Sequence, residues 1–355
     1  MRAFNARSRG PIGPAWRKIV LVGALAFAVT PPVRAAAPAA KDSSAVVTEV
    51  GAVGLTVADM DRSVDFFTRV LEFKKLSDTE LAGEALEKLE GVFGARARIV
   101  RLQLGEEQLE LTQYLAPEGR AFPALSRGND RWFQHVAIIV SDMDKAYARL
   151  RGMKVQHAST GPQRIPDWNK GAAGIRAFYF RDPDGHFLEI LSFPPDKGLA
   201  KWHATDRLFL GIDHTAIVVG DTDASLAFYR DRLGFKLAGQ GENYGPEQEH
   251  LNNVFGARLR ITSVRAAAGP AIEFLEYLAP RDGRPYPPDA RANDLVHWQT
   301  RLVTRSMDGA YGALRAAHAT FVSPGPVGVP DAGLGFRSGL LVRDPDGHAM
   351  EVVER

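Results

Sequence analysis

The stretch Arg181-Asp182-Pro183-Asp184-Gly185-His186 returns unchanged at residues 343–348, a spacing of 343 − 181 = 162 residues. The stretch VFGAR at residues 92–96 returns at residues 254–258, with the same spacing. Proline presets φ for a tight turn and glycine accepts positive φ, so the first stretch predicts a turn before a strand, with its histidine exposed. Two motifs repeated at one spacing indicate a tandem repeat of two similar halves.

Each half is predicted to divide again into two modules of one strand, one helix and three further strands. Apolar, β-branched runs predict the strands, and apolar residues at helical spacing predict the helix after each first strand. The first strands are expected at residues 52–57, 136–140, 215–219 and 300–303, and the last strands at residues 108–113, 187–191, 272–277 and 349–353. The predicted fold class is therefore α+β, with four βαβββ modules.

The N-terminus has the layout of a secretory signal peptide. Several basic residues precede the apolar run at residues 19–29, which Pro31 and Pro32 end before the small residues 35–37. This run is too short to span ~30 Å of hydrocarbon. We expect a signal peptide over residues 1–37, a flexible lead-in over residues 38–47, and a periplasmic or secreted protein. The absence of cysteine suits an oxidising compartment and excludes thiolate chemistry.

Composition limits the kinds of partner. The formal net charge is +2, and no block of basic residues interleaved with aromatics suggests binding to nucleic acid. We expect a small-molecule substrate, no membrane association after signal cleavage, and a monomer or homodimer.

The sequence motifs of the modules resemble those of the vicinal oxygen chelate superfamily, also called the glyoxalase/bleomycin resistance/dioxygenase fold. The resemblance rests on residues 214–219, on residues 233–235, and on the repeated RDPDGH with a glutamate three residues beyond. It covers the chain from about Thr48 to Glu354. It implies paired modules that form cup-like mixed-sheet barrels, here an N-terminal domain at residues 48–196 and a C-terminal domain at residues 209–355.

The resemblance also implies one divalent metal ion (Zn, Ni, Mn or Fe) per pair of modules, held by residues from the first and last strand of each module. In the C-terminal pair this predicts the set His214, Glu273, Gln299 and Glu351. In the N-terminal pair the matching positions are Ala52, Glu110, His135 and Glu189, and the alanine side chain cannot coordinate a metal. Glu110, His135 and Glu189 form a weaker second set, expected either to hold a metal weakly or to be structural. The C-terminal pair is therefore the predicted site, with Glu351 and Glu273 as groups that move a proton.

One alternative register remains open, because His297 lies two residues before Gln299 on the same predicted strand face. His214, His297 and Glu351 would then form the two-histidine, one-carboxylate set of extradiol dioxygenases. The spacing to the following helix favours Gln299. Arg301 lies on the same face and is expected either to meet an anionic substrate or to form an ion pair.

Three functions follow as expectations. The first is metal-dependent lyase or isomerase chemistry of the glyoxalase I kind on a small oxygen-rich substrate. The second is Fe(II)-dependent ring cleavage, and the third is non-catalytic sequestration of a small molecule.

Overall fold

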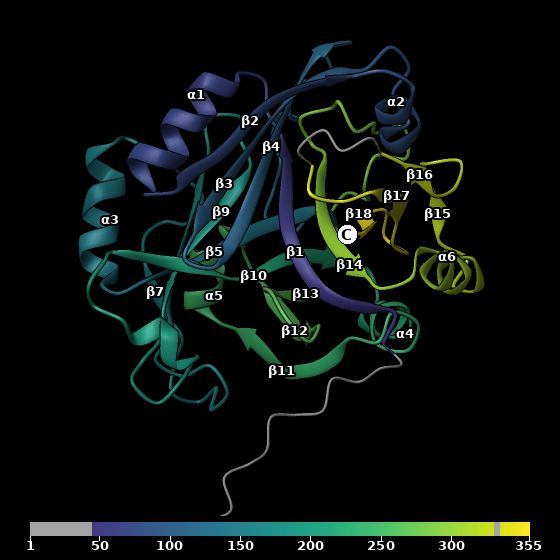
Figure 1. Cartoon of the computed structure of the whole chain (residues 1–355). Helices are drawn as coiled ribbons and strands as arrows, with labels where there is room; N and C mark the ends of the chain where they lie inside the picture. The colour runs from purple at the N-terminus through teal and green to yellow at the C-terminus, as the bar shows by residue number, and fades with distance from the viewer. Residues whose placement is uncertain (1–44, 330–333) are drawn as a thin grey trace, which may run out of the picture. The chain divides into compact units, whose positions relative to one another are not determined.

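Each module of this computed structural model begins with a strand that leads directly into a capped helix (Figure 1). Asp59 follows the first strand, and its Oδ1 accepts a hydrogen bond from the backbone N of Arg62 at 3.0 Å. Asp142, Asp221 and Ser306 cap the corresponding helices in the other modules. A capping side chain satisfies a backbone N–H that has no partner within the helix, so the strand–helix junction is set locally.

The structure describes residues 45–329 and 334–355, so the predicted signal peptide and most of the lead-in lie outside it. Module 1 comprises β1 (Val47–Thr56), α1 (Met60–Asp65), η1 (Phe66–Val70), β2 (Lys74–Ala82), α2 (Glu84–Glu90), β3 (Arg96–Leu104) and β4 (Glu107–Ala116). Module 2 comprises β5 (Phe133–Val140), α3 (Met143–Gly152), β6 (Gln156–His157), β7 (Gln163–Arg164), β8 (Arg176–Arg181) and β9 (Phe187–Ser192). The short helix η2 (Ala200–His203) joins the two halves.

Module 3 comprises β10 (Phe209–Val219), α4 (Thr222–Tyr229), β11 (Lys236–Tyr244), α5 (Pro246–Asn252), β12 (Arg258–Arg265) and β13 (Ala271–Ala279). Module 4 comprises β14 (Trp298–Thr304), α6 (Met307–Ala316), β15 (Thr320–Phe321), β16 (Val327–Gly328), β17 (Ser338–Arg343) and β18 (Ala349–Glu354). The four predicted modules are thus confirmed. Modules 1 and 3 add the helices α2 and α5, and in modules 2 and 4 two short strands replace the second strand.

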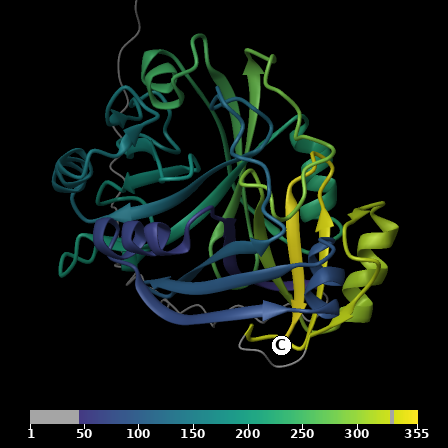
Figure 2. The ribbon, with the colours of Figure 1, turned by 90° about the horizontal axis from the view of Figure 1, so that it is seen from above.

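The strands form two mixed nine-stranded sheets, and each sheet combines modules from both halves. Sheet A has the order β15-β17-β18-β14-β1-β4-β3-β2, with β16 also paired to β17, and joins module 4 to module 1. Sheet B has the order β11-β12-β13-β10-β5-β9-β8-β6, with β7 also paired to β8, and joins module 3 to module 2. Both views place α2 of module 1 beside β17 of module 4 (Figures 1 and 2). The expectation that each half forms its own paired sheet was therefore wrong. Over the described residues both sheets are open, so neither is a closed barrel.

One face of each sheet packs into a shared core, and the candidate site residues lie on the opposite face. Val53 of β1, Ile138 of β5, Ile217 of β10 and Leu302 of β14 all belong to this core, to which α1, α3, α4 and α6 also contribute residues. Because successive side chains of a strand point to opposite faces, the residues beside them point away from the core. The candidate site residues alternate with core residues in this way.

The repeated RDPDGH motif forms the predicted turns, but its histidines are not exposed. Gly185 has φ 100°, and the backbone N of Asp182 bonds to the carbonyl of His186 at 3.0 Å. His186 and His348 are fully buried, and their Nδ1 atoms lie 2.7 Å from Asp182 and 2.9 Å from Asp344. The expected exposure was wrong because the turn folds back, so that the aspartate at its start pairs with the ring. Among the described residues, no helix is long and apolar enough to cross a membrane.

Candidate metal centre

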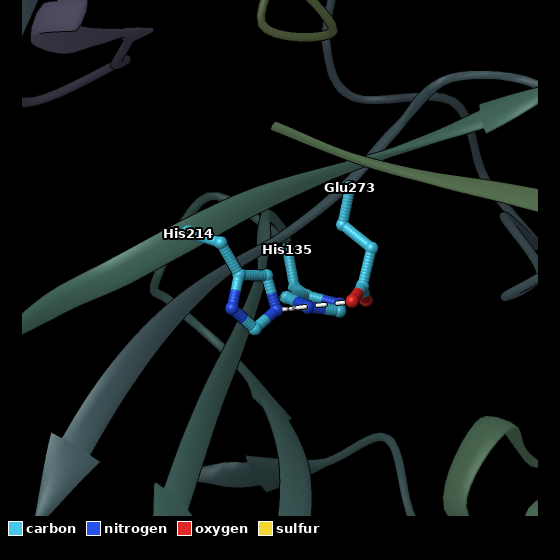
Figure 3. A group of neighbouring side chains, drawn as sticks. All are labelled: His135, His214 and Glu273. Atoms are coloured by element: carbon cyan, nitrogen blue, oxygen red, sulfur yellow. Dashed lines mark hydrogen bonds and ion pairs between the residues drawn. The ribbon is translucent and has the colours of Figure 1, made fainter. Parts of the chain in front are cut away.

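Four side chains that can bind a metal meet at the middle of sheet B. His135 lies on β5, Glu189 on β9, His214 on β10 and Glu273 on β13. These are the first and last strands of modules 2 and 3, and they are neighbours in the order β13-β10-β5-β9. Figure 3 shows His135, His214 and Glu273 converging from three strands.

The two imidazoles face each other through their Nε2 atoms, which are 3.2 Å apart. Oε2 of Glu189 lies 3.1 Å from Nε2 of His135 and 3.7 Å from Nε2 of His214. Oε2 of Glu273 lies 3.6 Å from Nε2 of His214. Ligand atoms of His135, His214 and Glu273 all lie within 4.8 Å of one another. Two imidazole nitrogens and carboxylate oxygens at this spacing form a donor set for a divalent ion of borderline hardness.

A neighbouring side chain holds the other nitrogen of each ring. Nδ1 of His214 lies 3.0 Å from Oδ2 of Asp213, and Nδ1 of His135 contacts Oε1 of Gln134. Both partners are hydrogen-bond acceptors, so the proton of each neutral ring is placed on Nδ1. The Nε2 lone pairs are then left directed at the shared space between the rings, as in metal-ligating histidines.

The charges around the cluster shift its protonation. Burial lowers the pKa of His214, but the carboxylates of Glu273, Asp213 and Glu189 outweigh it and raise that pKa to about 9. Burial raises the pKa of Glu273, and the neighbouring histidines oppose this. Arg265 pairs with Asp213 at 2.9 Å, and among the described residues a proton on imidazole is the other positive charge near these buried carboxylates.

Three residues of the cluster, Glu189, His214 and Glu273, line a cavity of about 450 Å³ on the face of sheet B that points away from the core. Its wall combines apolar side chains with neutral polar ones, among them Asn169, Gln240, Asn243, Gln248 and Ser263. Asp213, Glu189, His214 and Glu273 also line it, and none of its described lining residues is a lysine or arginine. A small molecule with several oxygen functions fits both the size and the chemistry of this wall.

The residues present therefore fit a divalent metal ion, and a buried oxygen supports this. Oε2 of Glu189 is almost fully buried, and Nε2 of His135 and of His214 lie near it at 3.1 and 3.7 Å. With the ring protons on Nδ1, this oxygen has no hydrogen-bond donor among the described residues. A buried carboxylate oxygen is costly unless it is hydrogen-bonded, paired with a cation or bound to a metal. A cation between the four groups would satisfy this oxygen and both Nε2 atoms together.

The structure divides the predicted C-terminal set. His214 and Glu273 belong to the cluster on sheet B, whereas Gln299 and Glu351 lie on β14 and β18 of sheet A. The weaker N-terminal set is divided too, since His135 and Glu189 lie on sheet B and Glu110 lies on β4 of sheet A. The prediction that His214, Glu273, Gln299 and Glu351 form one site was wrong because modules pair between the halves. The site instead takes two residues from each predicted set.

In sheet A an arginine lies where a metal would be expected. Nε of Arg301 donates to Glu351 at 2.5 Å, and its Nη1 and Nη2 donate to Glu110 at 3.0 and 2.6 Å. Burial raises the pKa of Glu90 to about 8, and the charges of Glu351 and Glu110 add to this. The apolar residues Leu86, Leu89, Leu334 and Phe336 also pack on this face. These residues do not fit a metal, and Glu351 is not placed to move a proton in the cavity.

The alternative ligand His297 also lies outside the sheet B cluster. It is buried just before β14, and its Nε2 lies 3.1 Å from Oε1 of Gln299. Burial lowers its pKa to about 4, so the ring is neutral. The expected dioxygenase set of His214, His297 and Glu351 is therefore divided between the sheets.

The sequence of the chain matches a known family over both halves. The model of the Glyoxalase/Bleomycin resistance protein/Dioxygenase superfamily matches residues 49–190 and 211–352. The chain belongs to this superfamily. The match ends at the last strand of each half and leaves out the segment between the halves, including η2.

Relatives of this superfamily member are named as enzymes of more than one kind. It is 37% identical over 146 residues to a 2-epi-5-epi-valiolone epimerase of Actinomyces sp, which covers 40% of this chain and 78% of the epimerase. It is 27% identical over 195 residues to a lactoylglutathione lyase of Schizosaccharomyces pombe, covering 53% of this chain and 60% of the lyase. The match therefore spans less than two thirds of that lyase.

Solved structures show that the superfamily fold extends over nearly the whole chain. A glyoxalase I mutant from Zea mays superposes with a TM-score of 0.57 at 17% identity, covering 86% of this chain and 92% of that one. A putative dioxygenase from Bacillus subtilis has a TM-score of 0.54 at 13% identity, covering 88% and 86%. At these identities the likeness shows the fold alone.

In this superfamily chain, sequence reasoning missed the side chains that support the two histidines. Asp213 and Gln134 each directly precede a histidine. A regular strand would place them on the opposite face from the ring. Register shifts in the pairing of β10 with β5 fall at both positions. Of the two supporting side chains, only Asp213 could have been suspected from the sequence, because it is an acidic residue next to a predicted metal-binding histidine.

Proposed function

We propose that the chain is a divalent-metal-dependent enzyme that moves a proton between carbon positions of a small, uncharged, oxygen-rich substrate, as an epimerase or isomerase does. The observation that carries the proposal is the convergence of His135, His214, Glu189 and Glu273 at the cavity of sheet B. These four residues would hold the ion. When bound, the ion supplies a Lewis acid for substrate oxygens.

Glu273 is the residue best placed to take the proton. Its side chain is 21% exposed, whereas that of Glu189 is 3% exposed. A general base must reach the substrate, so the more accessible carboxylate is assigned this role. The imidazoles keep their Nδ1 atoms in hydrogen bonds to Asp213 and Gln134 and are assigned to binding.

The cavity wall supports a neutral substrate. Amide and hydroxyl groups such as Asn169, Asn243 and Ser263 can exchange hydrogen bonds with hydroxyl or carbonyl groups. A glutathione adduct carries carboxylates, which proteins recognise with arginine or lysine. None of the described lining residues supplies such a cation. This favours the chemistry named for the epimerase relative over that named for the lyase relative.

A second candidate is oxidative ring cleavage with Fe(II). The observation that favours it is the close group of two histidines and one glutamate, His135, His214 and Glu273, which is the donor set of many non-haem iron oxygenases. Glu189 distinguishes the two candidates, because a fourth protein ligand leaves fewer positions for substrate and oxygen. Export is also part of the proposal, and it rests on the signal-like sequence of residues 1–37.

Solvent exchange tests the proposed reaction. The purified protein, loaded with Mn, Ni, Zn or Fe in turn, is incubated in deuterated water with cyclic polyhydroxy ketones, and deuterium at carbons next to the carbonyl is followed by NMR. We expect exchange that falls by about 10²–10⁴-fold in Glu273→Gln. Glu351→Gln, the matched control on sheet A, should leave the rate of folded protein unchanged. Oxygen-dependent consumption of catechols with iron, without exchange, would instead select the dioxygenase. Metal binding without either reaction would contradict both.

A further inference from the structure

The segment between the two halves contacts the candidate metal centre. Trp202 of η2 is almost fully buried, and its Nε1 donates a hydrogen bond to Oδ1 of Asp213 at 2.9 Å. Trp202 lies outside both ranges that match the superfamily. The contact therefore belongs to this chain's own connection between its halves.

A β-bulge turns Asp213 toward the cavity. Ile212 pairs with Ile138 and His214 with Ala137, so β10 has one extra residue between two consecutive partners on β5. An extra residue breaks the alternation of a strand and re-aims the side chain at that position. Asp213 and His214, although adjacent, consequently both line the cavity.

Three groups restrain the carboxylate of Asp213. Its Oδ1 accepts hydrogen bonds from Nε1 of Trp202 and from Nη2 of Arg265, each at 2.9 Å. Its Oδ2 lies 3.0 Å from Nδ1 of His214. With Oδ1 held by two donors, Oδ2 is fixed in position to accept from the imidazole.

A second contact holds η2 beside the bulge. Nζ of Lys201 donates to Oε1 of Glu107 at 2.5 Å, and Oε2 of Glu107 accepts from the backbone N of Ile212 at 3.2 Å. The residue before Trp202 is thus tied, through a side chain of β4, to the residue before Asp213. Trp202 is positioned by its neighbours as well as by its own burial.

Module 1 provides an internal comparison. Its first strand has the same bulge, since Val50 pairs with Leu302 and Ala52 with Arg301. The residues at the positions of Asp213 and His214 are Gly51 and Ala52, so the module without the histidine also lacks the carboxylate. The bulge thus occurs in β1 without a histidine after it, whereas the carboxylate of Asp213 occurs together with the imidazole of His214.

We infer that Asp213 and Trp202 are positioning residues for the metal: Trp202 holds Asp213, and Asp213 fixes the ring of His214 with Nε2 directed at the site. This rests on the proposed metal dependence. A carboxylate that binds the outer nitrogen of a metal-ligating histidine typically contributes 10–100-fold to metal affinity. Trp202, in the connection between the halves, would then raise the affinity for the metal through Asp213 and His214 without being a ligand itself.

Metal affinity tests the inference without any assay of activity. Co(II) and Zn(II) are titrated into the metal-free full-length protein in competition with a chelator. We expect Asp213→Ala to weaken binding by about 10–100-fold and the isosteric Asp213→Asn by less, because one acceptor oxygen remains. Trp202→Phe keeps an aromatic ring but loses the N–H and part of the buried indole, the same change that the control Trp132→Phe makes elsewhere. It should weaken binding by about threefold to tenfold while Arg265 still holds the carboxylate.

Trp132→Phe is the matched control. Trp132 is also buried and donates its Nε1 to a single acceptor, the carbonyl of Pro285 at 3.1 Å, but it does not line the cavity. The affinity of the Trp132→Phe variant for Co(II) and Zn(II) should stay within about twofold of that of the parent protein. Thermal unfolding of each metal-free variant shows which are folded, and ¹⁵N NMR of histidine reports whether His214 keeps its proton on Nδ1.

The outcomes separate the two proposals. If the parent protein binds neither ion, the proposed function fails. If the parent binds and folded Asp213→Asn, Asp213→Ala and Trp202→Phe bind equally well, the positioning roles are overturned. A loss of affinity in Trp132→Phe equal to that in Trp202→Phe would also overturn the role of Trp202.

Discussion

Arg301 donates two hydrogen bonds to Glu110, from Nη2 at 2.6 Å and from Nη1 at 3.0 Å, and so joins module 4 to module 1 in the middle of sheet A. Its backbone pairs with Ala52, which occupies the position that His214 holds in module 3. Where the imidazole is missing, a guanidinium from the facing strand compensates the carboxylates. In sheet A the charged residues Glu110, Arg301 and Glu351 thus pair with one another in a structural role, whereas the cavity lies on sheet B.

Removing this guanidinium should destabilise the fold. Arg301→Met leaves Glu110 and Glu351 buried without their cation, and the loss of one partner of a buried pair costs about 3–5 kcal/mol. We expect a fall of that size in the free energy of unfolding, measured by urea denaturation. Arg337→Met, at an exposed ion pair with Glu354, should change it little. Adding Glu110→Gln and Glu351→Gln to Arg301→Met should restore much of the loss; no restoration would argue against charge compensation.

Two buried histidines should differ in their effect on metal binding. His135→Ala removes a proposed ligand from the sheet B cluster and should weaken Zn(II) binding by more than the roughly 100-fold expected for a supporting residue. His297→Ala removes a histidine of similar burial that bonds to Gln299. It should leave the affinity unchanged, as measured by competition with a chelator. The reverse result would mean that the metal lies on sheet A.

The buried turn histidines should make the protein less stable at alkaline pH. Burial lowers the pKa of His186, but Asp182 and Asp184 and the carbonyl of Leu295 raise it above 6.5 on balance. A group with a raised folded-state pKa contributes stability that is fully present below its unfolded pKa and is lost as pH rises through the folded value. His348 behaves in the same way beside Asp344.

We therefore expect the melting temperature of the metal-free protein to fall as pH rises above about 6.5. The double variant His186→Gln and His348→Gln should melt lower at pH 6 and show a flatter dependence on pH. His250→Gln, at an exposed histidine of α5, is the control and should keep the slope of the parent. A double variant with that slope unchanged would assign the pH dependence to other groups.

The loop before β8 should open when its aromatic contact is removed. Trp168 stacks on Tyr244 with ring centroids 4.3 Å apart, and the neighbouring Asn169 donates to the carbonyl of Glu242 at 3.2 Å. An aromatic pair contributes about 0.5–1.5 kcal/mol beyond its buried area. Trp168→Ala should therefore raise the rate of tryptic cleavage after Lys170 by about twofold to tenfold. Phe255→Ala, at another exposed aromatic residue, should leave that rate unchanged.

The individual modules could be predicted from the sequence because their signals are local. The first strand expected at residues 215–219 lies within β10, and the last strand expected at residues 187–191 lies within β9. Side-chain periodicity, capping residues and the proline–glycine turn each act within a few residues. His135, Glu189, His214 and Glu273 were also identified individually, because the resemblance to the superfamily implies ligands at these positions of the repeat.

The grouping of these residues was decided only by tertiary structure. The alternation of side chains along β1 or β10 shows which of them share a face of the sheet. It does not show which strand lies alongside, because the backbone groups that pair strands are common to all sequences. The pairing of β10 with β5 and of β14 with β1 brings His214 to His135 and leaves Arg301 beside Ala52. The bulge at Asp213 likewise depends on its partner strand, since an extra residue exists only relative to the strand that it faces. The modules thus follow from local sequence signals, whereas the packing of modules between the halves brings His135, Glu189, His214 and Glu273 together.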